Sequence, residues 1–99
     1  MPTLKKTAFQ TLKLPSDVTK SYVQSAIEEQ KNDIGMYGHK HLSELTGIGD
    51  SRIKNAAIGR NRLTMEEMDK ISVFSKFNLF EVENDLAEKH PLIFKELKK

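Results

Sequence analysis

Residues 45–57 read Leu45-Thr-Gly-Ile-Gly-Asp-Ser-Arg-Ile-Lys-Asn-Ala-Ala57, and this stretch decides the predicted fold. Leu42 and Leu45 are three residues apart, so they share one face of a helix. Gly47 can adopt the positive φ that ends a helix, and Ile53 then returns as an inward-facing position of a second helix. The stretch therefore predicts two short helices, at residues 39–46 and about 50–58, joined by a tight turn.

The residues after this turn resemble one family. Gly59 follows the second helix, residues 60–62 form a basic loop, and Thr64-Met-Glu-Glu67 begins another helix with a capping-box signature. In this register, residues 27–86 resemble the phage lambda repressor-like (Cro/C1, XRE-type) helix-turn-helix family. The resemblance implies an all-α bundle of five to six short helices. It also implies a transcriptional regulator, with repression as the expected activity, that places a recognition helix in the major groove of duplex DNA.

Two alternatives remain open from the sequence. The pattern Leu42-x-x-Leu45-x-Gly47-Ile48-Gly49 also resembles the helix-hairpin-helix of DNA repair proteins, whose loop amides bind phosphate regardless of base sequence. The same lambda repressor-like fold can also serve as a protein-interaction module, such as an antitoxin or an adaptor. Such a module would use the carboxy-terminal segment, which is rich in Phe and Leu.

Further helices are predicted around the motif. One occupies residues 15–31, one begins at Thr64, one occupies residues 78–90, and residues 92–97 add a last turn or two. Residues 1–14 lack helical periodicity and are predicted to be a basic, extended amino-terminal arm of a domain at residues 15–99. The expected core positions are apolar or small residues at helical spacing, namely Val18, Tyr22, Val23, Ala26, Ile27, Met68, Ile71, Phe74 or Ser75, Val82 and Leu86.

Composition and charge agree with a nucleic-acid binder. Residues 1–14 and residues 39–62 each carry +3, whereas the net charge of the whole chain is only +2. The chain has no cysteine, which excludes a disulfide and a thiolate nucleophile. Its apolar runs are far shorter than the ~20 residues of a membrane span, and no signal peptide follows Met1. We expect a cytoplasmic, nucleoid-associated protein of a bacterial or phage-infected cell, with no membrane partner.

The resemblance assigns base contacts to the recognition helix. The positions that match are Asp50, Ser51 and Asn55. Arg52 and Lys54 lie at the flanks of the groove, and we predict that Arg52 contacts bases and that Lys54 contacts phosphates. The Asn55 amide can accept a hydrogen bond from adenine N6 while it donates to N7. The Asp50 carboxylate can accept from a cytosine amine.

Phosphate contacts are expected from both sides of the motif, because such contacts supply most of the affinity and fix the register on the duplex. The arm lysines Lys5, Lys6 and Lys13 are weaker candidates. The predicted phosphate contacts are His39, Lys40, Lys54, Arg60, Asn61 and Arg62.

The sequence offers no catalytic site. Two steps along a helix turn about 200°, so His39 and His41 point to opposite sides and cannot bind one metal ion from one helix face. We expect no enzyme activity, cofactor or metal. One recognition helix covers only about four or five base pairs, so we also predict a homodimer on DNA, with residues 78–99 as the dimer contact or as the surface for a protein partner.

Overall fold

The computed structural model describes residues 7–34 and 37–98, and all regular elements in these two ranges are helices. The all-α prediction is therefore confirmed. Within the described residues, one isolated antiparallel bridge joins Lys13 to Thr64. The seven helices are α1 (Ala8–Thr11), α2 (Ser16–Ile34), α3 (Gly38–Thr46), α4 (Asp50–Ala57), α5 (Met65–Ser72), α6 (Leu79–Lys89) and α7 (Pro91–Leu97).

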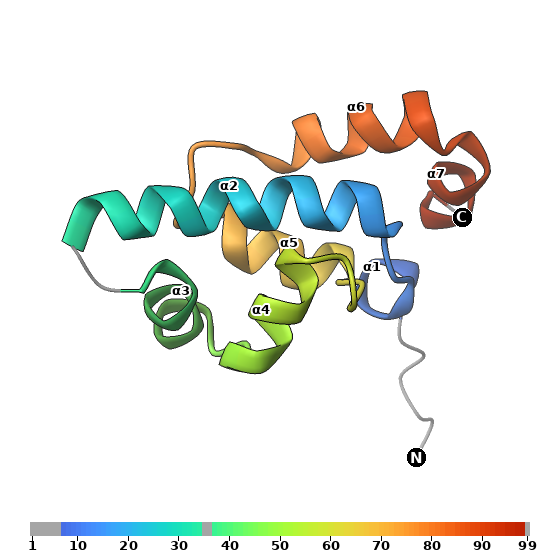
Figure 1. Cartoon of the computed structure of the whole chain (residues 1–99). Helices are drawn as coiled ribbons and strands as arrows, with labels where there is room; N and C mark the ends of the chain where they lie inside the picture. Colours follow the sequence, from blue (N-terminus) through green and yellow to red (C-terminus); the bar gives the residue numbers. More distant parts are fainter. Residues whose placement is uncertain (1–6, 35–36, 99) are drawn as a thin grey trace, which may run out of the picture.

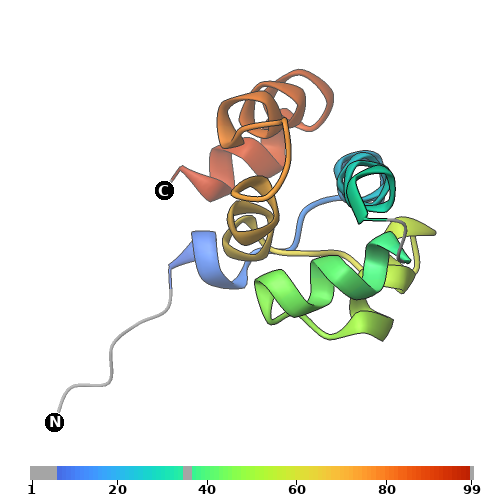
Figure 2. The ribbon, with the colours of Figure 1, turned by 90° about the vertical axis from the view of Figure 1, so that its left-hand side faces the viewer.

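The longest helix, α2, runs through the middle of the molecule. It contacts α3, α4, α5 and α6. In Figure 1, α3 and α4 lie below α2, whereas α6 lies above it, and the view in Figure 2 also separates α6 from the α3–α4 pair. The α3–α4 pair and α6 are therefore on opposite sides of α2.

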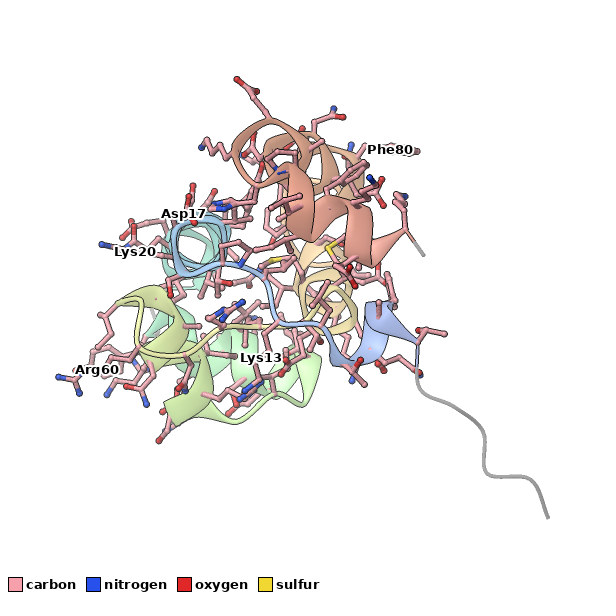
Figure 3. All side chains as sticks on the ribbon, turned by 90° about the vertical axis from the view of Figure 1, so that its right-hand side faces the viewer. Lys13, Asp17, Lys20, Arg60 and Phe80 are labelled. Carbon is pink, nitrogen blue, oxygen red and sulfur yellow. The ribbon has the colours of Figure 1, made fainter. Side chains whose placement is uncertain are left out.

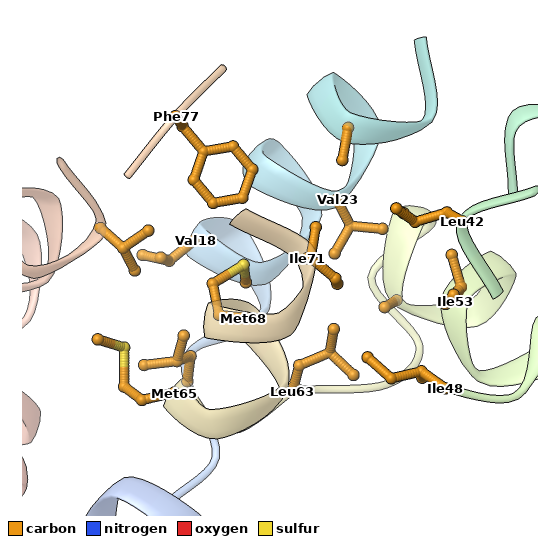
Figure 4. Close-up of a cluster of buried hydrophobic side chains, with 14 of the residues drawn as sticks. Val18, Val23, Leu42, Ile48, Ile53, Leu63, Met65, Met68, Ile71 and Phe77 are labelled. Carbon is orange, nitrogen blue, oxygen red and sulfur yellow. The ribbon is translucent and has the colours of Figure 1, made fainter. Parts of the chain in front are cut away.

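Buried side chains from α2 to α6 fill the core, with α5 at its centre (Figure 4), and partly buried residues of α7 pack against it. Predicted core residues on α2 and α5, such as Val23, Met68 and Ile71, are fully buried. Phe74 is an exception, because it is 37% exposed. Helix α5 ends at Ser72, so helical spacing no longer applies to Phe74, and Phe77 instead packs on Tyr22 at 4.9 Å between ring centroids.

The amino-terminal segment is not wholly an extended arm, and this part of the prediction is wrong. Residues 8–11 form α1, which contacts α5 and α7, and Leu14 is fully buried. The Leu14 amide donates to the Leu63 carbonyl at 2.7 Å, and the buried Thr19 hydroxyl donates to the Leu14 carbonyl at 3.4 Å. Backbone pairing with residue 63 holds this segment down, which no local pattern predicts. Lys5 and Lys6 lie outside the described residues.

The junction between α2 and α3 depends on one glycine. Helix α2 continues three residues past the predicted end at Lys31, and α3 begins at Gly38, one residue before the predicted start. A Cβ at Gly38 would lie 2.1 Å from the Ile27 carbonyl oxygen, so only glycine allows the two backbones to approach this closely. This contact sets where α3 starts relative to α2.

Helix α6 is anchored on α2 through Tyr22, whose hydroxyl donates to Asp85 at 2.5 Å. Burial, and then the adjacent carboxylate, raise the pKa of Tyr22 well above its ordinary value. Val82 and Leu86 are fully buried as predicted. Among the described residues, no helix is both long enough and apolar enough to cross a bilayer.

Candidate nucleic-acid interface

The turn between α3 and α4 is a three-residue connection closed by internal hydrogen bonds. Gly47 has a φ of +78°, which makes a helix end of the kind the sequence predicts. The Gly47 amide donates to the Ser43 carbonyl at 2.9 Å, and the Ile48 amide donates to the Thr46 hydroxyl at 3.2 Å. The Ser43 hydroxyl in turn donates to the Ile48 carbonyl at 2.6 Å. Two of the three turn amides are therefore used inside the protein.

Helix α4 has one buried face and one exposed face. Ile53 and Ala56 are fully buried, as expected for Ile53, whereas Ser51 and Lys54 are exposed and Asn55 is half-buried. Since Ser51, Lys54 and Asn55 are spaced three and four residues apart, they form one continuous outward stripe. Leu42 is fully buried, but Leu45, which was expected on the same inward face, is 38% exposed.

The first residue of α4 is paired with the second residue of α3. His39 Nδ1 lies 2.6 Å from Asp50 Oδ1, and the two side chains are 25% and 45% exposed. The His39 ring also stacks on Tyr37, with centroids 5.8 Å apart and planes 23° apart. Tyr37 is 76% exposed and was missed by the sequence analysis; its place just before the predicted helix is the only signal it gives.

The Arg52 side chain is bonded within the protein, which does not fit its grouping with the base contacts. Its guanidinium makes two hydrogen bonds to the Glu67 carboxylate, with Nε 2.6 Å from Oε2 and Nη2 2.8 Å from Oε1. The hydrogen bond that Arg52 donates to Glu67 raises the pKa of Arg52. Burial opposes ionisation of Glu67, but the bonds from Arg52 and the Thr64 amide outweigh it and lower the pKa of Glu67. Arg52 therefore fixes α4 on α5.

The two arginines of the basic loop have different surroundings. Arg62 donates through Nε to the Leu14 carbonyl at 2.8 Å and through Nη2 to the Lys13 carbonyl at 2.9 Å. Arg60 is exposed and makes no side-chain hydrogen bond to the described residues, and Figure 3 shows it extending away from the protein. The phosphate role predicted for both thus suits Arg60, whereas Arg62 holds the amino-terminal segment.

The remaining predicted phosphate contacts are available at the surface. Lys40 and Lys54 are exposed, and Asn61 is half-buried. The structure adds Lys20 of α2, which sequence analysis missed: it is exposed, and its Cδ lies 3.9 Å from the position that a Cβ on Gly59 would occupy. Figure 3 places Lys20 and Arg60 on one side of the molecule, away from Phe80.

The residues that the structure describes contain no metal-binding group of side chains. No three His, Asp or Glu side chains within residues 7–34 and 37–98 come together as a metal site requires. His90 instead contacts both oxygens of Asp17 at 3.0 Å, and the hydrogen bond from His90 is the main reason that the pKa of Asp17 is lowered.

Comparisons of the chain with protein-family models, with curated proteins and with solved structures found no match. A functional assignment therefore rests on the geometry of α3 and α4 described above.

Proposed function

We propose that this protein binds duplex DNA sequence-specifically, as a transcriptional regulator of the lambda repressor-like helix-turn-helix class, with α4 in the major groove. The observation that carries the proposal is the outward stripe of Ser51, Lys54 and Asn55 on a helix whose opposite face is fully buried. A polar, cationic stripe on a short helix after a glycine turn suits insertion into a groove about 12 Å wide.

Base recognition falls to three residues of α4. Asn55 offers an amide for adenine, and Ser51 offers a hydroxyl that can serve several bases. Asp50 has one oxygen bonded to His39, which leaves Oδ2 without a hydrogen bond to the described residues and able to accept from a cytosine amine. Arg52 supports these residues by holding α4 in place.

Phosphate binding falls to the exposed cations around α4. Lys40 lies in the first turn of α3, Lys54 on α4 and Arg60 in the following turn, with Lys20 beside that turn. Each neutralised phosphate adds about 0.9 to the slope of log K against log salt concentration. Arg62 contributes indirectly, because it fixes the backbone of the loop that carries Arg60.

The turn disfavours the helix-hairpin-helix alternative. That mode needs loop amides that are free to donate to a phosphate. Here the Gly47 and Ile48 amides donate within the protein, and the Ile48 side chain is buried.

A protein-interaction role remains a second candidate because of the carboxy-terminal helices. Phe80 on α6 is 75% exposed and Leu92 on α7 is 78% exposed. Helix α6 lies across α2 from α3 and α4, and α7 packs on α6 beyond one end of α2, so the protein could hold DNA and a second chain at the same time (Figure 1). A homodimer would use the same two helices.

Selection of binding sites from random duplexes, followed by affinity measurements at fixed salt, tests the proposal. We expect a preferred site bound well over ten times more tightly than unrelated duplex. A ratio near one would contradict sequence-specific binding and favour the helix-hairpin-helix mode. No DNA binding, together with a tight protein complex, would favour the interaction module.

A further inference from the structure

Ile58, the residue that caps the carboxyl end of α4, is 58% exposed, whereas Ile53 and Ala56 of this helix are fully buried. It lies seven residues after Ser51 and three after Asn55, so it continues the outward stripe of the helix. A single exposed isoleucine is unremarkable on most surfaces. This one stands at the end of the surface that we propose to enter the major groove.

The position of Ile58 is fixed by the turn that follows it. The Gly59 amide donates to the Ala56 carbonyl at 3.2 Å, and the Arg60 amide donates to the Asn55 carbonyl at 2.8 Å. From α2, the Gln24 side chain donates to the Ala57 carbonyl at 2.7 Å. Hydrogen bonds to the backbone on both sides of Ile58 thus hold this residue where its side chain stays outside the core, in a stretch of sequence that also carries the exposed cations Lys54 and Arg60.

An isoleucine has no donor or acceptor, so it can distinguish bases only by apolar contact. In the major groove, the apolar group on the edge of an unmodified base pair is the C5-methyl group of thymine. We propose, on the basis of the DNA-binding function above, that Ile58 contacts a pyrimidine C5-methyl group, that of thymine in unmodified DNA. The cations Lys54 and Arg60 on either side of it would bind the phosphates that border this base.

The test replaces each thymine of the selected site, one at a time, by deoxyuridine, which lacks only the methyl group. Affinity is measured at fixed salt for the native protein, for Ile58→Ala and for the conservative Ile58→Val. We expect deoxyuridine at one position of the site to weaken native binding about fourfold, the equivalent of one buried methyl group. Ile58→Ala should lose a similar factor on the thymine duplex and be insensitive to deoxyuridine at that position, whereas Ile58→Val should retain the sensitivity.

Val73→Ala is the matched control. Val73 is 71% exposed and, like Ile58, follows a helix as its cap residue, but it belongs to α5. This variant should respond to deoxyuridine as the native protein does. The inference is overturned if the native protein selects a site but no thymine position responds, or if Ile58→Ala responds as strongly as the native protein. A protein that selects no site at all would overturn the proposed function itself, which is a different result.

Discussion

Arg52 of α4 and Glu67 of α5 form a two-bond ion pair, with Nε to Oε2 at 2.6 Å and Nη2 to Oε1 at 2.8 Å. Glu67 also completes the capping box of α5, since its Oε1 accepts from the Thr64 amide at 3.1 Å. The Glu67 carboxylate thus caps the first turn of α5 and also binds Arg52 of α4. The pair adds a side-chain link from α4 to α5, beside the packing of the buried Ile53 and Ala56 that seats α4 on α2 and α3.

The first prediction concerns pH. Because the pKa of Glu67 is lowered in the folded protein, the pair stabilises the fold above the ordinary glutamate pKa of about 4.3, and this stability is lost as the pH falls through the lower, folded value. Glu67→Gln keeps the capping box but not the charge, so it should cost about 1 kcal/mol at neutral pH, a modest value because the Arg52 side chain is 37% exposed.

Thermal unfolding followed by circular dichroism from pH 7 to pH 3 measures this effect. The difference between native protein and Glu67→Gln should shrink as the pH falls. Glu66→Gln is the control, because Glu66 makes no ion pair within the described ranges although it lies in the same helical turn. A constant difference across the pH range would mean that the charge of Glu67 does not matter.

The second prediction concerns base recognition by Asn55. Asn55→Ala should lose about 1–3 kcal/mol of binding free energy on the preferred site and almost nothing on unrelated duplex, because a base contact contributes discrimination and no charge. Fluorescence anisotropy on both duplexes at one salt concentration provides the comparison. Equal losses on the two duplexes would refute the role of Asn55 in reading a base.

The third prediction separates the two arginines of the loop. Arg60→Gln should lower the slope of log K against log salt by about 0.9 without changing thermal stability, because its side chain makes no hydrogen bond to the described residues. Arg62→Gln should instead lower the melting temperature, since it removes the bonds to the Lys13 and Leu14 carbonyls. The reverse pattern would show that Arg62 is the phosphate contact.

The fourth prediction concerns the core beneath α4. Ile53→Asp should unfold the domain, because it places a carboxylate without a partner at a site with no exposure. Leu45→Asp should be tolerated much better, since Leu45 is 38% exposed. Circular dichroism at 25 °C is sufficient for both variants. A folded Ile53→Asp variant with unaltered thermal stability would mean that the buried face of α4 has been misassigned.

The fifth prediction concerns assembly. We expect two copies on an inverted repeat with half-sites about 10 base pairs apart, joined through residues 78–99. Replacing both Phe80 and Leu92 by serine should weaken occupation of the second half-site while the fold is kept, because both side chains are exposed. Val73→Ser, on an exposed side chain of another element, is the control. Sedimentation that finds one protein per duplex at saturation would exclude the dimer.

Much of the local structure follows from the sequence alone. The sequence predicted the ends of α3 and α4 to within about a residue, and Gly47 adopts the expected positive φ. The capping box at Thr64 and Glu67 and the burial of Ile53 are likewise confirmed. All of these features depend on residues within one or two helical turns, where spacing and side-chain chemistry set the outcome directly.

Only the tertiary structure decided which polar residues are free for a ligand. Arg60 and Arg62 look equivalent in the sequence, and Arg52 was predicted to contact bases, yet Arg52 and Arg62 are both bonded within the protein. The partners of Arg52 and Arg62 lie 15 and 48 residues away, and these contacts exist because the fold brings the Arg52 side chain to the first turn of α5 and because residues 13–14 pair with residues 63–64. Helical periodicity carries no information about such distant neighbours, so the basic charge of this segment could be predicted but its division between binding and folding could not.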